Sequence, residues 1–590
     1  MAEALISPGV FLRENDQSQI TAGPITVGAA LIGPTVVGPK DIPTLVTSYS
    51  QYRAVFGTTF ISGGTSYEYL TSMAAFNYFQ QGGESLLVTR VTSGSYTAAT
   101  SSIVPSQKGD GFPVFELETL SVGDIMNNDF SSSLGINTTS ILPSGSTSNL
   151  RWEVTGVDSG SGYFTLLVRR GDDYNMSKTV LETWSNLSLD PNQSNYIEYV
   201  IGNQTTTVRT DEFGAKYLQI TGSYRNASNY VRVKNVFLPT PNYLTPQGQP
   251  YSYYTASMPK NGSGSYNGSF GGANGPIYGC FDSAPLNMFE AIPTLAASIP
   301  SRNIQGVLAT DYNTAIDLLK NQDDYDYNVI YAPGINAQNA NSQISNLLTN
   351  TQDRGDAIAV LDMVGYGQAQ TTVTTLAQQY DNSYGATYWP WVQLRSQETG
   401  KLNFVPPSMI VPAVYEYNDK VSAEWFAPAG LNRGGLPTVL QPERRLTVGQ
   451  RNLLYSGKVN PIAVFPGQGT VIYGQKTLQA RASALDRVNV RRLLIALKRY
   501  IRQIAETLVF EQNTAVTRNR FLSQVNPYLQ FVQQRQGLYA FRVVMDDTNN
   551  TPDVIDRNLL VGAIYLQPTR TAEFIQLDFN ILPTGATFGQ

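Results

Sequence analysis

The 590-residue sequence contains no histidine and a single cysteine, Cys280. Without histidine the chain lacks the most common general base near neutral pH, Ser-His-Asp and Cys-His catalysis, histidine-ligated zinc and the usual pH switch. Cys280 has no second cysteine to pair with and no histidine to activate it, so we expect an inert, packed thiol. The composition argues against an enzyme, and we expect no catalytic residues, no metal and no cofactor.

Charged residues and long apolar runs are also scarce. Only 14% of the residues are Asp, Glu, Lys or Arg, and the abundance of Ser, Thr, Asn, Gln, Gly and Tyr is typical of a β-rich structural protein. No run of about 20 apolar residues occurs, and no basic segment followed by an apolar one opens the chain. We therefore expect neither a signal peptide nor insertion into a membrane.

The charge that is present is unevenly distributed. Residues 441–520 contain fourteen Lys or Arg and four Asp or Glu, a net charge of +10, which leaves −15 for the rest of a chain whose total is −5. Such a basic region is suited to an anionic partner, which charge alone leaves open as a nucleic acid, an acidic membrane or an acidic protein.

The hydrophobic pattern divides the chain into regions, and at this length two to four domains are expected. Residues 21–95 have apolar runs, two helical patterns and a buried strand, which predicts a compact α/β unit. Residues 96–295 have short alternating runs in a polar background, which predicts one or two inserted β-rich domains. After residue 300 apolar strands again alternate with helices, which predicts βαβ units and a sheet flanked by helices.

Three short patterns resemble binding loops and are better interpreted as turns or loops. The Asp-x-Asp-x-Asn pattern that begins at Asp324 has calcium-loop spacing, but Val329 stands where that loop needs glycine. The glycines of residues 466–477 resemble a phosphate loop, but a Val-Ile-Tyr strand follows where a helix N-terminus is required. The Gly- and Tyr-rich residues 258–279 contain one lysine, so a long loop is favoured over nucleic-acid stacking.

Six segments occur along the chain in a recognisable order. They are SPGVFLREN (7–15), FGTTF (56–60), NYFQQGGESLLVTRV (77–91), SYGATYWPWVQL (383–394), NFVPPSMIVPAVYEYNDKVSAEWFAPAGLNRGG (403–435), and RVNVRRLLIALKRYI (487–501) followed by VFEQN (509–513). Together they resemble contractile tail sheath proteins, which clothe the tube of contractile bacteriophage tails and related injection machines. The resemblance covers residues 1–95 and about 300–590, and the middle third departs from it.

The resemblance implies a multidomain α+β or α/β fold, with an inner α/β core formed by the N- and C-terminal parts of the chain and β-rich outer domains inserted between them. Combined with the composition, it predicts six regions. These are an N-terminal extended arm (1–20), the N-terminal part of the sheath core (21–95), inserted outer domains (96–295), an α/β sheath domain (296–440), a C-terminal inner core domain (441–568) and a C-terminal extended arm (569–590).

The implied function is that of a structural subunit. It polymerises helically as stacked rings around the tail tube and contracts to drive the tube through the host cell envelope for genome delivery. The implied partners are further copies of the chain, the tail tube protein, and baseplate and tail terminator proteins, with no direct nucleic-acid contact. The implied location is the virion tail after synthesis in the bacterial host cytoplasm, and the length and large insertions favour a phage over another injection system.

Sheath proteins use extended arms that add strands to the sheets of neighbouring subunits. This would give the short apolar run at the start of the chain a partner, since an isolated strand leaves its backbone groups unpaired. The predicted arm residues are Pro8, Gly9, Val10, Phe11, Leu12, Phe574, Ile575, Leu577 and Phe579. The alternative is that both termini pair within their own subunit.

A basic amphipathic helix is predicted within the basic region. Its apolar face comprises Leu493, Leu494, Leu497, Ile501, Ile504, Ala505 and Leu508, and Ile495 and Val509 interrupt the polar side. The resemblance places this region innermost, so it implies tube-facing roles for Arg491, Arg492, Lys498, Arg499 and Arg502. The alternative is a solvated basic face, because exposed ion pairs contribute only ~0–1 kcal/mol each.

Two other classes of protein stay open on the sequence alone. One is a host-binding surface protein, or adhesin, whose Tyr-rich middle domains recognise glycans. The other is a histidine-free hydrolase that uses paired carboxylates. Electron microscopy separates them, since sheath subunits should form tubes and the other two classes discrete particles.

Overall fold

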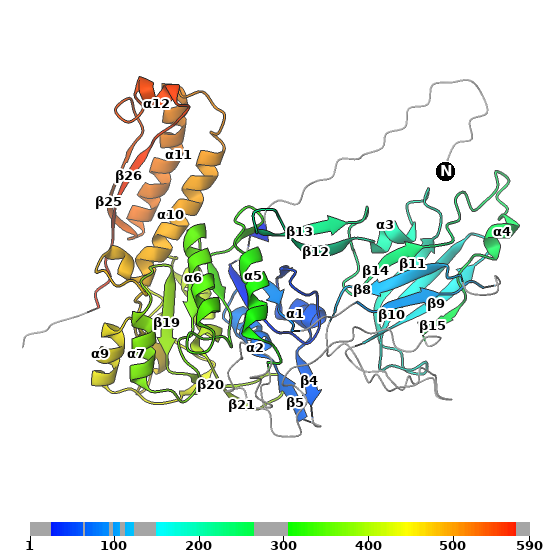
Figure 1. The fold of residues 1–590 in the computed structure, drawn as a ribbon, viewed down its shortest axis with the longest axis horizontal. Helices are drawn as coiled ribbons and strands as arrows, with labels where there is room; N and C mark the ends of the chain where they lie inside the picture. Colours follow the sequence, from blue (N-terminus) through cyan, green and yellow to red (C-terminus); the bar gives the residue numbers. More distant parts are fainter. Residues whose placement is uncertain are drawn as a thin grey trace, which may run out of the picture.

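The computed structural model describes residues 25–26, 28–62, 65–93, 98–106, 112–122, 149–264 and 305–573. Figure 1 shows an elongated molecule: a β-rich part lies at one end, a sheet flanked by helices extends from the middle towards the other end, and a mainly helical lobe projects from the sheet at that end. The predicted mixed α/β class is confirmed. The predicted arm residues and Cys280 lie outside the described residues.

The middle of the molecule is built on one eight-stranded sheet of order β24-β23-β19-β18-β17-β2-β6-β3. Strand β2 pairs in parallel with both β6 and β17, so the sheet joins two segments that are far apart in the sequence. The strands are β2 (Ala29–Gly33), β3 (Thr44–Val46), β6 (Leu86–Arg90), β17 (Val329–Tyr331), β18 (Ile358–Leu361), β19 (Gly385–Trp389), β23 (Asn460–Phe465) and β24 (Gly469–Ile472).

Both faces of this sheet are covered, which explains the nearly continuous apolar runs of its strands. Alternate residues of β2 enter two different cores: Leu31 packs in one and Ile32 in the other. The first face carries α1 (Tyr49–Phe56), α2 (Leu70–Gln80) and α8 (Val411–Val421). The second carries α5 (Tyr312–Leu318), α6 (Asn341–Arg354), α7 (Gln370–Gln378) and α9 (Val448–Ser456).

Local sequence fixes several helix ends. Ser48 caps α1 by accepting a hydrogen bond from the Gln51 amide, and Thr447 and Gln450 form a reciprocal capping box at the start of α9. Helix α6 ends at Gly355, whose φ of 72° suits glycine.

The glycines of residues 466–477 lie in and beside the β23–β24 hairpin, so their interpretation as a turn is confirmed.

Short strands and 3-10 helices connect these elements. They are β1 (Ile25–Thr26), β4 (Thr59–Ser62), β5 (Thr65–Glu68), β16 (Tyr325–Asp326), β20 (Val392–Arg395), β21 (Leu402–Val405), β22 (Val439–Pro442), η3 (Ala309–Asp311), η4 (Pro407–Met409) and η5 (Ala484–Asp486). Strand β16 covers part of the predicted calcium-like pattern and pairs with β1.

The described part of the predicted β-rich region has its own hydrophobic core. Two of its sheets have the orders β11-β10-β9-β15 and β14-β8-β7. A separate hairpin, β12–β13, contacts α5, and Leu218 packs against the core of the middle sheet. The elements are β7 (Thr100–Ile103), β8 (Phe115–Thr119), β9 (Leu150–Asp158), β10 (Tyr163–Arg170), β11 (Val180–Ser188), α3 (Ile197–Ile201), β12 (Thr205–Thr210), β13 (Lys216–Thr221), β14 (Val231–Val236), α4 (Ser252–Thr255) and β15 (Gly262–Ser263).

The third part is a C-terminal lobe with a separate apolar core. It consists of α10 (Val488–Glu506), α11 (Ala515–Gln534), β25 (Leu538–Val544), α12 (Pro552–Asp556) and β26 (Ala563–Pro568). The predicted division at residue 440 is wrong, because β23 and β24 belong to the middle sheet. The prediction failed because the basic region that suggested this boundary extends over two structural units, the middle sheet and the C-terminal lobe.

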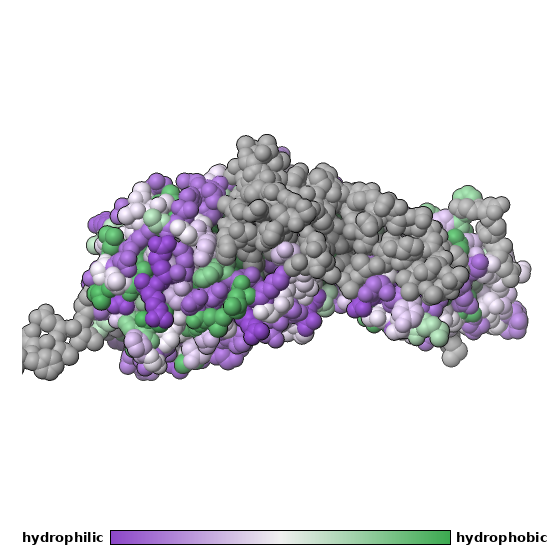
Figure 2. Space-filling view, turned by 90° about the horizontal axis from the view of Figure 1, so that it is seen from below, coloured by the Kyte–Doolittle hydropathy of each residue, from purple (hydrophilic) through white to green (hydrophobic). Residues whose placement is uncertain are grey.

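The molecular surface mixes polar and apolar side chains. In Figure 2 the coloured surface shows small hydrophobic areas set among hydrophilic ones, which is ordinary for a protein surface. Among the described residues, every helix is too short or too polar to cross a membrane.

Replacing Leu31 by alanine should test the sheet that joins the two chain segments. Leu31 is 0% exposed, so Leu31→Ala should lower the free energy of unfolding by about 2–5 kcal/mol. Urea denaturation followed by circular dichroism measures the change. Leu402→Ala, at an exposed position, is the matched control and should change it by no more than about 0.5 kcal/mol. Equal effects of the two variants would contradict the assignment of β2 to the core.

Candidate subunit-interaction site

Helix α10 has the apolar face that the sequence predicts. Leu493, Leu497, Ile504 and Leu508 are buried in the core of the C-terminal lobe, where Leu494 and Ile501 pack at the margin. The facing residues of α11 are Phe521, Val525, Leu529 and Val532. The predicted stripe is confirmed except at Ala505, which is exposed.

The opposite face of α10 is buried as well. Val488 and Ile495 belong to the core of the middle sheet, and Arg491 and Arg492 are only 4% and 2% exposed. The expectation that these two arginines face outward is therefore wrong. We call this contact, of Val488, Arg491, Arg492, Ile495 and Arg499 with the middle part of the molecule, the α10 junction.

Each buried arginine of the α10 junction has partners within the subunit. The Arg491 guanidinium lies 4.0 Å from the ring centroid of Tyr384 and donates a hydrogen bond to the Ser383 hydroxyl. Arg492 donates from both terminal nitrogens to the Asp419 carboxylate, with Nη1 2.8 Å from Oδ1. This paired geometry is the strong form of an arginine–carboxylate contact.

The charge balance around Arg492 is set by carboxylates that the sequence prediction missed. Burial on its own lowers the pKa of Arg492, but Asp419, with a smaller contribution from Glu424, more than offsets this and raises the pKa. Burial also raises the pKa of Glu416 to about 7, with repulsion from Asp419 adding to the shift and Arg492 opposing it. The segment VYEYNDKVSAEW held a clue to these partners, because Glu416, Asp419 and Glu424 follow one another there at spacings of three and five residues.

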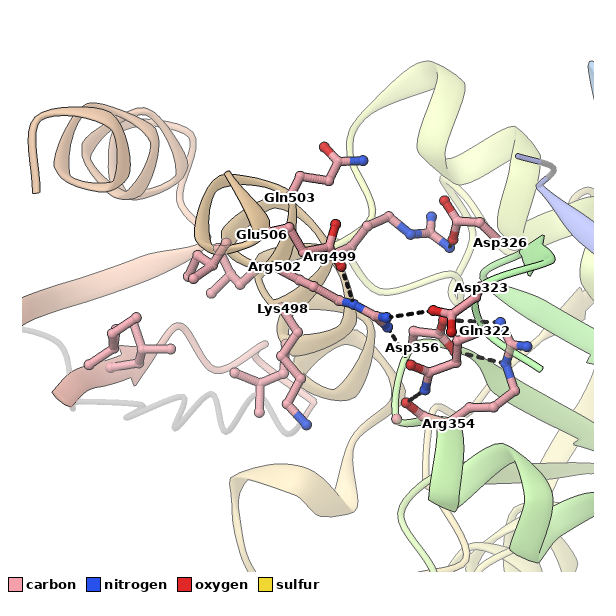
Figure 3. A pocket seen from close by; sticks show the side chains of 16 residues that line it. Gln322, Asp323, Asp326, Arg354, Asp356, Lys498, Arg499, Arg502, Gln503 and Glu506 are labelled. Atoms are coloured by element: carbon pink, nitrogen blue, oxygen red, sulfur yellow. Dashed lines mark hydrogen bonds and ion pairs between the residues drawn. The ribbon is translucent and has the colours of Figure 1, made fainter. Parts of the chain in front are cut away.

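The remaining three cations of α10 lie around a cavity of about 690 Å³ between the helix and the middle part (Figure 3). Arg499 pairs with Asp326 at 2.6 Å, and Arg502 pairs with Asp323 at 3.2 Å. Lys498 donates to the Tyr384 hydroxyl at 3.2 Å and points away from those carboxylates. Apolar side chains also line the cavity: Leu494, Leu497, Ile501, Ile564 and Leu566. Of the five predicted tube-facing residues, Arg491, Arg492 and Arg499 thus belong to the α10 junction, and Lys498 and Arg502 lie exposed at the cavity beside it.

Strands β25 and β26 form a second candidate surface. They pair only with each other among the described residues, so each has an edge without a neighbouring strand. Phe541, Val543, Ile564 and Leu566 pack on the lobe core, while Tyr539 and Tyr565 are exposed. A two-stranded sheet with one face supported and both edges open is suited to accept further strands.

Neither surface has the geometry of a metal centre. In the described ranges, no group of three or more Cys, Asp or Glu side chains is arranged to hold a metal ion. What the structure brings together is internal charge pairing at the α10 junction and an open-edged sheet on a supported lobe. Of the two, the open-edged sheet is the feature that a further strand could extend.

Comparisons with known proteins identify the family of the domains. Residues 305–478 match the family model of the phage tail sheath protein central domain, and residues 481–581 match that of the phage tail sheath C-terminal domain. The chain therefore carries two domains of the phage tail sheath family, which confirms the resemblance drawn from its motifs.

Individual relatives agree with this identification. The tail sheath proteins of Vibrio phage KVP40 and Enterobacteria phage T4 are 42% and 40% identical over 187 residues, or 32% of this chain and 28% of each relative. The tail sheath protein of Salmonella phage ViI is 29% identical over 291 residues, or 48% of this chain and 46% of that protein. The chain thus matches less than half the length of each of these relatives.

Solved sheath structures are also similar to this chain. A sheath tail protein from Listeria innocua has a TM-score of 0.48 at 11% identity, covering 90% of each chain. The contracted sheath complex of an extracellular contractile injection system has a TM-score of 0.40 at 24% identity, covering 46% of this chain and 75% of that chain.

Arg492→Met should be far more damaging than Arg502→Met. The first substitution leaves Asp419 without its buried partner, which should lower the free energy of unfolding by about 3–5 kcal/mol. The second removes a cation that is 46% exposed, which should cost no more than about 1 kcal/mol. Urea titration of both variants makes the comparison, and a near-neutral Arg492→Met would show that α10 does not depend on this pair.

Glu416→Gln should remove part of the pH dependence of stability. Glu416 has a pKa raised from 4.5 to about 7 in the folded protein, so the folded state retains a proton that the unfolded state releases between these values. The free energy of unfolding should therefore fall as pH rises through this window, by up to about 3 kcal/mol from this group. Denaturation midpoints from pH 4.5 to 8 measure it. Glu506→Gln, at an exposed position, is the matched control for the loss of one carboxylate; a wild-type slope in Glu416→Gln would refute the assignment.

Proposed function

We propose that this chain is the sheath subunit of a contractile bacteriophage tail. It polymerises helically around the tail tube and contracts to drive the tube through the host cell envelope for genome delivery. The observation that carries the proposal is the pair of adjoining tail sheath domains at residues 305–478 and 481–581. The proposal extends to the whole chain what those domains indicate for its second half, and nothing found favours the adhesin or hydrolase alternatives.

In this proposal the β25–β26 sheet accepts strands from neighbouring subunits. The donors are the predicted arm residues that lie outside the described residues: Pro8, Gly9, Val10, Phe11, Leu12, Phe574, Ile575, Leu577 and Phe579. Main-chain hydrogen bonds to the open edges would provide affinity, and alternating apolar side chains would fix the register. Exchange of strands between copies would join the rings of the sheath into a continuous helical mesh.

The C-terminal lobe faces the tail tube in the proposed assembly, and the β-rich part of residues 96–295 lies outside. Lys498 and Arg502 retain a proposed tube contact because they are exposed, whereas Arg491 and Arg492 are committed to the α10 junction. Arg499, which pairs with Asp326, contributes mainly to that junction. Baseplate and tail terminator proteins would bind the two ends of the sheath, and the assembled chain would reside in the virion tail.

Contraction in this proposal draws on contacts between subunits. The lattice of subunits would have an extended and a contracted state. It would change to the contracted state because the contacts between subunits have the lower free energy there. Because α10 is buried on both sides, the lobe and the middle part would move together as one body. The strands exchanged between copies would then carry the transition from ring to ring, without nucleotide hydrolysis.

Deleting residues 1–18 should separate folding from assembly. The deletion ends before β1 and the middle sheet, so the far-ultraviolet circular dichroism should stay that of the folded protein. Assembly should be lost, because the N-terminal donor strand is missing. Negative-stain electron microscopy should show hollow tubes for the wild type and discrete particles for the deletion.

A variant in which residues 1–18 are replaced by a Gly-Ser segment of equal length controls for chain length and should also fail to assemble. Normal tubes from either variant would refute the arm hypothesis. Discrete particles from the wild type under all assembly conditions would count against the sheath function itself.

A further inference from the structure

The last described residue of the chain is held by three separate segments of its own subunit. The Glu573 carboxylate accepts hydrogen bonds from Arg487 Nε at 2.7 Å, Gln475 Nε2 at 3.0 Å and the Tyr455 hydroxyl at 2.6 Å. Gln475 Nε2 also donates to the Thr571 hydroxyl at 2.6 Å. We call Glu573 and its three donors the Glu573 clamp.

The clamp holds a charged group in a well-defined setting. The Glu573 side chain is 17% exposed, although its neighbours Arg570 and Ala572 are exposed. Burial alone would raise the pKa of Glu573, but the hydrogen bonds from Arg487, Tyr455 and Gln475 more than offset this and lower it. The carboxylate is therefore ionised at neutral pH, and each bond to it belongs to the stronger, charge-assisted kind.

The position of the clamp in the chain path gives it a mechanical consequence. Arg487 is the residue immediately before α10, where the chain leaves for the C-terminal lobe, and Glu573 is where it returns. Tyr455 lies in α9, and Gln475 follows β24 of the middle sheet. The clamp thus fastens the exit of the lobe to its entry, on the unit that contains the eight-stranded sheet.

Without the clamp, tension on the end of the chain would act on β26. That strand is attached to β25 as a hairpin, with Thr569 bonded to the Gly537 carbonyl at 3.1 Å as the outermost contact. A hairpin pulled from the end of one strand opens one hydrogen bond at a time, which is the weakest direction of loading. With the clamp, the same tension meets Glu573 first.

We propose that Glu573 is the anchor through which tension on the C-terminal segment, residues 574–590, passes into the middle sheet. The inference rests on the proposed function, in which that segment binds a neighbouring subunit. Its partner is a second copy of this chain, and Glu573 acts as a positioning residue that protects the β25–β26 acceptor sheet while the segment is under load.

Single-molecule force measurements on the full-length subunit test the anchor directly. One handle is attached after Gln590 and the other at Asn339→Cys, an exposed position on the middle part, in a Cys280→Ser background. At constant force, the first opening step should occur about tenfold faster in Glu573→Gln than in the wild type, since bonds to a charged group are lost. Asp553→Asn, which breaks an exposed pair with Arg557 in the same lobe, is the matched control and should leave the rate unchanged.

Hydrogen exchange on the unassembled subunit provides a second readout. The Thr569 amide and the amides of β26 should exchange faster in Glu573→Gln, and by a smaller factor in Tyr455→Phe, which removes one donor and retains the Arg487 and Gln475 contacts. Because Tyr455→Phe is a mild change, it keeps the test valid where Glu573→Gln fails to fold. Wild-type opening rates and wild-type exchange in these variants would overturn the anchor.

Tube formation distinguishes this inference from the function on which it rests. If the wild type forms tubes but the variants open and exchange as the wild type does, the anchor is wrong and the sheath function stands. If the wild type forms no tubes while the variants open faster, the clamp does hold the end of the chain. The sheath function, which was to supply the tension on that end, is then wrong.

Discussion

The parallel pairing of β2 with β17 is the constraint on which the rest of the structure depends. Val329, Ile330 and Tyr331 lie opposite Ala29, Ala30 and Leu31, so residues separated by about half the chain share one sheet. The chain leaves this sheet after β6, builds the separate core of the β-rich part, and rejoins the sheet at β17. The sheet can therefore keep its two covered faces while the β-rich part has a core of its own.

The C-terminal lobe depends on the same sheet through α10. An amphipathic helix normally buries one face, but α10 places Leu493 and Leu497 in the lobe core and Val488 and Ile495 in the sheet core. The buried pair of Arg492 and Asp419 then ties the helix to α8. With the chain also returning to the sheet unit at Glu573, the lobe has connections at its entry, along its first helix and at its exit.

Sequence patterns predicted the features that depend on the spacing of apolar residues, and they missed the features that depend on which side chains pair. The alternation of strands and helices after residue 300 and the leucine stripe of α10 follow from the spacing of apolar residues, and the structure has both. The burial of Arg491 and Arg492 does not follow from spacing, because a buried arginine has the same periodicity as an exposed one. Its partners, Tyr384 and Asp419, come from distant segments. Ile495 was the available signal: an apolar residue on the polar side of a helix indicates a second buried face.

The predicted family followed from ordered motifs, and several of those motifs prove to be structural contacts. The segment SYGATYWPWVQL contains β19 and the Tyr384 ring beneath Arg491, and VYEYNDK contains the Asp419 partner of Arg492. Together they supply the surfaces against which RVNVRRLLIALKRYI packs, which gives a physical reason for these segments to occur together.

The absence of histidine removes the usual source of pH sensitivity, yet the fold supplies another. Asp362 is buried and accepts hydrogen bonds from the Ser408 amide, at 3.1 Å, and the Ser408 hydroxyl, and burial raises its pKa to about 7. Glu416 reaches a similar value beside the Arg492–Asp419 pair. Glu416 lies in α8, and Asp362 directly follows β18 and contacts Ser408 in the 3-10 helix η4, which precedes α8. Raising the pH through neutrality therefore introduces negative charge into the packing of the middle part, at Glu416 beside the Arg492–Asp419 pair and at Asp362 next to Ser408. Burying an ionised carboxyl costs more free energy than burying a neutral one, so both groups make the free energy of unfolding fall as the pH rises through neutrality, although the chain contains no histidine.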